Sequence, residues 1–253
     1  MRISALTGLQ RCQGFVELRR DAPRTESRAS NSGSAAGRAI ELWHTGDRAM
    51  AECIDVVLGP ELSRWPLADE DDVSRWSLAY AKDPRNDPLS ATITHCEAEV
   101  RLTMPPAPED PTKEPVIFVG HIDQLRDDKV WDVKSGRGKP IRGKQELAYD
   151  AYGHDLTLDY AWQIAAYALA CTETFGRPIL PGGVIRLRGY ESKKTPSPVF
   201  YSTPWTLADC RTMIETAVYE IGIIRSGVIL LRPGTHCNWC PAEHPHLCER
   251  MLQ

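Results

Sequence analysis

The chain has 253 residues, of which 42% are hydrophobic and 25% charged, a composition that excludes collagen-like, wholly disordered and coiled-coil proteins. This length suits one domain with a large core and some appendages. The net charge of −4 excludes a general attraction to nucleic acid, so any DNA-binding surface has to be local. The longest apolar run, around Ile164 to Cys171, is too short to span a membrane, and the N-terminus lacks an apolar signal core. We therefore expect a cytoplasmic protein without membrane contact.

The first third of the chain predicts helices. Residues 1–20 suit a short helix, and the polar stretch after it, rich in small residues, predicts a loop. From Ala35 to about Leu58, apolar residues recur at spacings of three and four, which predicts one long amphipathic helix. A further helix is expected over Asp69–Lys82, because Asp83-Pro84 would end it.

The remainder predicts strands followed by alternating helices and strands. Three strands are expected in residues 91–104, 116–125 and 129–135, with a polar, Pro-rich connection between the first two. A helix at about 158–175, strands at 183–188 and 199–202, and a last helix at about 207–226 follow. Thr206 and Asp209 offer that last helix a capping box. This order predicts an α/β fold with a central mixed sheet flanked by helices. We assign residues 35–228 to the core, 1–34 to an N-terminal segment and 229–253 to a C-terminal tail.

A predicted hairpin at residues 120–134 has the most chemical content. If its turn centres on Asp127-Asp128, Asp123 lies directly opposite Asp132 and both side chains leave the same face. Lys134 shares that face because side chains of a strand alternate. Two close carboxylates repel unless a cation lies between them, and oxygen ligands favour Mg²⁺ or Mn²⁺ over zinc. The alternative is a solvated hairpin whose charges are ordinary surface charges.

These residues resemble a known family. Gly120-His-Ile-Asp, Asp132-Val-Lys and a later helix with Gln163 and Tyr167 resemble the PD-(D/E)XK nuclease superfamily, and most closely its RecB-like branch. That branch includes the CRISPR-associated iron–sulfur exonucleases and related phage proteins, and it has these motifs in this order. The resemblance implies a restriction-endonuclease-like core and a metal bound by Asp123, Asp132 and the backbone of Val133. It implies catalytic roles for a set of five residues: Asp123, Asp132, Lys134, Gln163 and Tyr167.

The same resemblance places a further metal ligand on the first long helix, after a Gly-x-x-x pattern. Gly37 followed by Glu41 fits this pattern, and His44, one turn further on, is the alternative ligand. An exposed glutamate without a role also remains open for Glu41. Glu97 and Glu99, in the strand before the hairpin, are expected on an exposed face.

Three cysteines near the C-terminus, Cys237, Cys240 and Cys248, form a metal-binding pattern. A zinc site would be closed locally by His244 or His246. A [4Fe-4S] cluster would need a fourth thiolate from elsewhere in the chain. The resemblance implies Cys12 for this role, because iron–sulfur members of the branch take one cysteine from before the nuclease core. Such a cluster would join the two ends of the chain.

A basic loop follows the hairpin and carries Arg137, Lys139, Arg142 and Lys144. Cations beside a carboxylate metal site suit contact with a phosphate backbone, although a solvated loop is the alternative. Together the motifs predict a metal-dependent DNA nuclease, an exonuclease of phage or bacterial DNA processing that works with recombination, repair or defence proteins. A non-catalytic DNA-binding or assembly subunit is the main rival, and a zinc-bearing adaptor is a third reading. The intact Asp123, Asp132 and Lys134 argue against the rival.

Overall fold

The computed structural model describes residues 1–13, 27–89, 93–136, 160–188 and 199–229. Its 3₁₀ helices are η1 (Ile3–Ala5), η2 (Leu62–Arg64) and η3 (Pro84–Asn86). Its α-helices are α1 (Leu6–Arg11), α3 (Arg28–Thr45), α4 (Met50–Leu58), α5 (Glu70–Ala81), α7 (Ala161–Phe175) and α8 (Leu207–Arg225). Its strands are β1 (Ile93–Met104), β2 (Val116–Arg126), β3 (Lys129–Gly136), β4 (Leu180–Arg188) and β5 (Val199–Ser202). None of these helices is both long and apolar enough to cross a bilayer.

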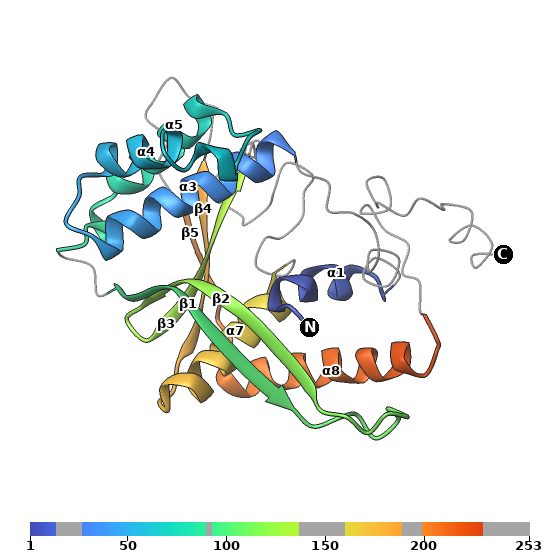
Figure 1. Ribbon diagram of the computed structural model, residues 1–253. Coiled ribbons are helices and arrows are strands. Elements are labelled where there is room, and N and C mark those ends of the chain that lie inside the picture. The colour runs from blue at the N-terminus through green and yellow to red at the C-terminus, as the bar shows by residue number, and fades with distance from the viewer. Residues whose placement is uncertain (14–26, 90–92, 137–159, 189–198, 230–253) are drawn as a thin grey trace, which may run out of the picture.

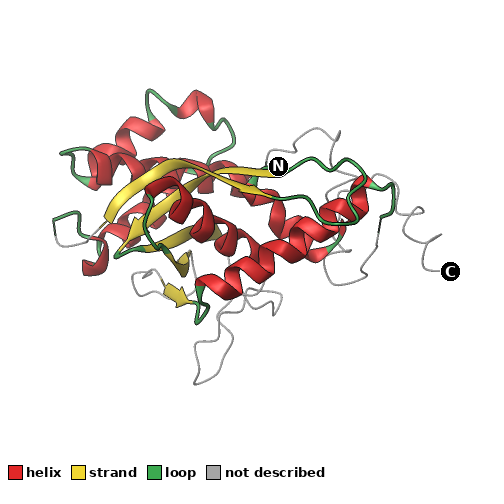
Figure 2. Ribbon diagram, turned by 90° about the horizontal axis from the view of Figure 1, so that it is seen from below, coloured by secondary structure: helices red, strands yellow, loops and turns green. Residues whose placement is uncertain are grey.

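The five strands form one sheet in the order β1-β2-β3-β4-β5. Only the β3–β4 pair is parallel, so the predicted mixed sheet is confirmed. Helices α3, α4 and α5 pack together on one side of it, and α1, α7 and α8 lie on the other (Figure 1). The view from below shows helices flanking the strands (Figure 2). The chain therefore has an α/β fold, consistent with the restriction-endonuclease-like core expected from the sequence.

The β2–β3 hairpin has the predicted turn and register. Gln124 pairs with Trp131, and Leu125 pairs with Val130. Asp127 and Asp128 have φ values of 48° and 57°, so both central residues of the turn are left-handed, as in a type I′ turn. Aspartate tolerates this conformation better than most residues do. The two-residue turn thereby fixes which side chains of the two strands face each other.

The single long helix predicted from Ala35 to about Leu58 is wrong. Helix α3 begins earlier, at Arg28, where the Ser27 side chain accepts a hydrogen bond from Ser30 N at 3.1 Å. It ends at Thr45, because Gly46 is extended, and α4 starts only at Met50. The side chain of Glu52 accepts from Ala49 N at 3.0 Å, which stabilises the start of the second helix.

The first eleven residues belong to the core of the fold. Met1 pairs with β2: its backbone oxygen accepts from Val119 N at 3.0 Å. Ile3, Leu6 and Leu9 are fully buried in the hydrophobic cluster that also contains residues of β1, β2, α7 and α8. The N-terminal segment thus packs against both β2 and α7, and the α1 helix ends at Arg11.

Candidate active site

The β2–β3 hairpin brings Asp123, Asp132 and Lys134 together. Asp132 is almost fully buried, with 3% of its side chain exposed. Lys134 Nζ lies 2.9 Å from Asp132 Oδ1 and 2.7 Å from Oδ2. The Asp123 carboxylate accepts a hydrogen bond from the backbone N–H of Val133. Two acids and one amine therefore converge on one face of the hairpin.

Helix α7 contacts this hairpin through Gln163 and Tyr167. Gln163 Nε2 donates to Asp132 Oδ1 at 3.0 Å, and both side chains are buried. Tyr167 lies over Gly120, where a Cβ atom would come within 3.0 Å of the tyrosine ring. Glycine at the start of the Gly-His-Ile-Asp segment therefore gives Tyr167 its place beside the two aspartates. Gln163 and Tyr167, four residues apart on α7, therefore pack against the hairpin together, and Gly120 in β2 leaves the space for them.

A cavity of about 740 Å³ lies between α3 and the hairpin. This volume is within the range of about 300 to 1,000 Å³ in which pockets enclose small ligands. Acidic, basic and aromatic side chains share its lining: Glu41, Glu97, Asp123, Arg38, Arg64, Lys134, Trp65 and Tyr160. The guanidinium carbon of Arg64 lies 5.0 Å from the Trp65 ring centroid. Arg64 and Trp65 were not predicted from the sequence, since neither lies in a recognisable motif.

The α3 wall of the cavity consists mainly of small residues. Gly33, Ser34, Gly37 and Glu41 lie at spacings of one, three and four and line the same cavity. A Cβ atom at Gly33 would lie 2.2 Å from Ser135 Oγ, so only glycine lets α3 approach β3 this closely. This close approach brings Glu41 to the cavity that contains Asp123. Glu41 is also 2.8 Å from Arg38 in an ion pair.

His44, the alternative to Glu41, is not among the lining residues of the cavity. Its Nε2 lies 2.9 Å from the hydroxyl of Tyr80, and the Gln124 side chain donates to the same hydroxyl. Burial and, to a smaller extent, the charge of Arg126 lower the pKa of His44 to about 4. His44 therefore belongs to a buried polar network between α3, α5 and β2.

Glu97 is a cavity residue that the sequence reading assigned to an exposed face. Cys96 pairs with Gln124 and Ala98 with Ile122, so Glu97 lies across the ladder from Asp123. Its φ of 50° is the one left-handed value inside a strand among the non-glycine residues of the described segments. Burial, followed by the charge of Glu41, raises the pKa of Glu97. Glu99, by contrast, is exposed as expected.

The electrostatics of the hairpin are dominated by its acids. Burial and then the charge of Asp132 raise the pKa of Asp123 well above its ordinary value, although Lys134 opposes this. Burial lowers the pKa of Lys134, but the charges of Asp132 and Asp123 together outweigh it and raise the pKa overall. The two acids therefore favour the charged form of Lys134, and a metal ion would in turn favour the ionised form of Asp123.

The residues present fit a Mg²⁺ or Mn²⁺ ion in their chemistry. Asp132 Oδ2 is buried and accepts no hydrogen bond within the described part of the chain, so its contact is the ion pair with Lys134. The described residues contain no group of three or more His, Cys, Asp or Glu side chains arranged around one metal position. Mg²⁺ is commonly held by one or two carboxylates and completed by water and substrate phosphate, so this arrangement suits it.

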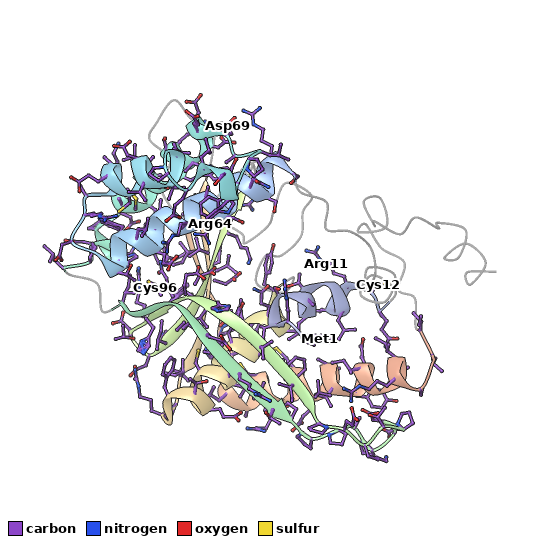
Figure 3. All side chains as sticks on the ribbon, viewed as in Figure 1. Met1, Arg11, Cys12, Arg64, Asp69 and Cys96 are labelled. Atoms are coloured by element: carbon purple, nitrogen blue, oxygen red, sulfur yellow. The ribbon has the colours of Figure 1, made fainter. Side chains whose placement is uncertain are left out.

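Several predicted residues fall outside the described residues. These are the three C-terminal cysteines and the basic loop, namely Cys237, Cys240, Cys248, Arg137, Lys139, Arg142 and Lys144. Cys12 is described: it directly follows α1 and is 7% exposed (Figure 3). Its predicted partners cannot be placed, so the cluster and its zinc alternative stay predictions.

Comparisons with known proteins agree with this fold. The family model of the PD-(D/E)XK nuclease superfamily matches residues 6–248. The fold is similar to the crystal structure of a "putative exonuclease" from Eubacterium rectale, with a TM-score of 0.54 and 12% sequence identity. The alignment covers 95% of this chain and 92% of the other. No curated protein matches the chain. At this identity, the structural similarity supports the fold alone.

Proposed function

Because the chain belongs to the PD-(D/E)XK nuclease superfamily, we propose that it is a metal-dependent deoxyribonuclease that removes nucleotides from DNA ends. The observation that carries this proposal is the convergence of Asp123, Asp132 and Lys134 beside a cavity that Asp123 and Lys134 line. The chain retains an acidic pair, a lysine and a Gln-x-x-x-Tyr helix in mutual contact. A non-catalytic subunit would have no use for this arrangement.

The proposed metal ion is Mg²⁺ or Mn²⁺. Asp123, Asp132 and the backbone carbonyl of Val133 would hold it, with Glu41 as a further ligand in preference to His44. Glu41 is favoured because it lines the cavity, whereas His44 bonds to Tyr80. When bound, such an ion polarises a phosphoryl oxygen and lowers the pKa of bound water.

The chain's own residues have distinct parts in this proposal. Asp132 is oriented by two donors, Gln163 Nε2 and Lys134 Nζ, which both contact Oδ1. The charges of Asp132 and Asp123 raise the pKa of Lys134, which suits it to stabilise negative charge that develops on the phosphate. Its Nζ lies 5.0 Å from the ring centroid of Tyr160, which further restrains the amine.

The cavity is suited to a DNA strand by its polar and aromatic lining. Arg64 is an exposed cation next to Trp65, so this pair can contact a phosphate and stack on a base. The cavity volume suits a few nucleotides of one strand. We propose that the loop cations Arg137, Lys139, Arg142 and Lys144 add phosphate contacts that carry no sequence information.

Two further predictions remain part of the proposal. We propose a [4Fe-4S] cluster bound by Cys12, Cys237, Cys240 and Cys248, with zinc as the alternative, and a cytoplasmic role in phage or bacterial DNA processing. The resemblance of the cysteine spacing supports the cluster. The non-catalytic DNA-binding subunit is the alternative function, and it requires DNA binding without cleavage.

The test is a nuclease assay on matched linear and covalently closed circular DNA, with Mn²⁺ or with a chelator. We expect Mn²⁺-dependent release of nucleotides from the linear DNA and none from the closed circle. End-labelled single- and double-stranded substrates define the strand preference. Cleavage of the circle would indicate an endonuclease instead of an exonuclease. DNA binding without cleavage of any substrate would support the alternative function.

A further inference from the structure

Helix α1 makes two polar contacts with α7, besides the burial of Leu6 and Leu9. Thr7 Oγ1 donates to Gln163 Oε1 at 3.0 Å. Gln10 Oε1 accepts from Trp162 N at 3.2 Å, in the first turn of α7. Figure 3 shows the N-terminal segment between Met1 and Cys12 beside the sheet. The start of the chain therefore contacts the helix that carries the catalytic motif.

The Gln163 side chain uses both ends of its amide. Its nitrogen donates to Asp132 Oδ1 and its oxygen accepts from Thr7, and the residue is 3% exposed. An ionised carboxylate can only accept hydrogen bonds, so the amide nitrogen has to face Asp132 and the oxygen has to face away. Thr7 donates to this oxygen, and Tyr167 is a further hydrogen-bond partner of the Gln163 side chain. Without the Thr7 hydroxyl, the oxygen would be buried without that partner.

We propose that Thr7 is a positioning residue of the active site, acting on Asp132 through Gln163. By fixing the amide, Thr7 would keep Asp132 Oδ1 engaged with Gln163, so that Oδ2, which is paired with Lys134 at 2.7 Å, would be the oxygen left for a metal ion. This inference rests on the proposed function for its effect on the metal. Residues that orient a metal ligand through one intermediate group typically change metal affinity or activity by about 10 to 100-fold.

Gln10 supplies a matched comparison for Thr7. Both residues lie on α1, and each contributes a side-chain hydrogen bond to α7. Only the Thr7 bond continues to Asp132, because the Gln10 bond ends at a backbone N–H. A purely structural role of α1 docking would make the two bonds equivalent, whereas positioning of Asp132 would distinguish them.

The test measures Mn²⁺ binding by electron paramagnetic resonance on the full-length protein without DNA. Thr7→Val removes the hydroxyl at nearly constant volume, Thr7→Ser keeps it, and Gln10→Met removes the other bond. We expect Thr7→Val to weaken Mn²⁺ binding about tenfold. Thr7→Ser and Gln10→Met should keep the affinity of the parent. Equal affinities for Thr7→Val and Gln10→Met would overturn the inference.

A second readout separates this inference from the proposed function. The measurement is NMR of the side-chain amide protons of Gln163 in the metal-free protein. We expect Thr7→Val to shift them and Gln10→Met to leave them in place. If the parent binds no Mn²⁺, the proposed function fails, but these resonances still decide whether Thr7 orients Gln163. Unchanged Gln163 resonances in Thr7→Val would overturn the positioning role whatever the metal does.

Discussion

Glu97 faces Asp123 across the β1–β2 ladder, at the one position inside a described strand where a non-glycine residue has a left-handed backbone. Such a conformation is uncommon for glutamate, and residues in it cluster at functional sites. Together with its place in the cavity lining, this indicates that Glu97 adds a further carboxyl group beside Asp123.

We predict that Glu97→Gln lowers Mn²⁺-dependent cleavage by about tenfold, because the substitution keeps the size of the side chain but removes charge that favours a divalent cation. Glu99→Gln is the matched control, since Glu99 lies two residues away on the same strand with 74% of its side chain exposed. Initial rates measured at several Mn²⁺ concentrations give the comparison. Equal rates for the two variants would remove Glu97 from the site.

A second prediction distinguishes the two candidate ligands on α3. Arg38 is ion-paired with both Glu41 and Glu61, at 2.8 Å and 3.1 Å, but only Glu41 lines the cavity. Glu41→Gln should therefore raise the Mn²⁺ concentration needed for half-maximal cleavage, while Glu61→Gln, which removes the other ion pair of Arg38 together with that of Arg64, should not. His44→Gln should also leave this Mn²⁺ concentration unchanged. A larger effect of His44→Gln than of Glu41→Gln would make His44 the metal ligand in place of Glu41.

The partly buried His44 predicts a pH dependence of stability. Its pKa is about 4 in the folded protein, so between this value and its ordinary pKa the unfolded chain binds more protons than the folded one. The neutral His44 thus makes its full contribution to the free energy of unfolding above its ordinary pKa. This contribution, at most about 3 kcal/mol, is lost as the pH falls toward 4. The free energy of unfolding in urea should differ less between about pH 7.5 and about pH 5 for His44→Gln than for the parent. The same pH difference in both proteins would place His44 in contact with solvent.

The predicted cluster can be tested through Cys12. A four-thiolate cluster needs this residue, whereas a local zinc site does not. Joining Cys12 to Cys237 would restrict the unfolded chain by on the order of 5 kcal/mol in the ideal-chain estimate. Anaerobically purified protein should be brown, Cys12→Ser should bleach it and lower its melting temperature, and Cys96→Ser, on β1, should keep the colour. Colourless protein containing one zinc ion, with Cys12→Ser as stable as the parent, would favour the zinc site.

The hairpin was predictable from the sequence because a two-residue turn fixes the register of the strands it joins. The positions of Asp123, Asp132 and Lys134 followed from that register alone. Glu97 was not predictable in this way, since a long Pro-rich connection between β1 and β2 leaves their register undetermined. The break at Gly46 was missed because apolar residues continue at helical spacing on both sides of it.

Contacts between residues far apart in the chain were also not predicted from the sequence. Thr7 and Gln163 are far apart in the chain, and a threonine in a short helix carries no local signal of its partner. Trp65 and Arg64 likewise reach the cavity through the packing of α3 and the segment around η2, which no periodicity describes. These residues are defined by tertiary structure.

The most direct test of the proposed nuclease is Mn²⁺-dependent nucleotide release from end-labelled linear DNA by Asp132→Asn. Asn has the shape of Asp but lacks the charge that pairs with Lys134 and would bind the metal. Asp128→Asn is the control in the same hairpin, because Asp128 is an exposed turn residue whose left-handed backbone suits asparagine. We predict that Asp132→Asn folds and releases no nucleotides while Asp128→Asn retains the rate of the parent. Undiminished release by a folded Asp132→Asn protein would contradict it.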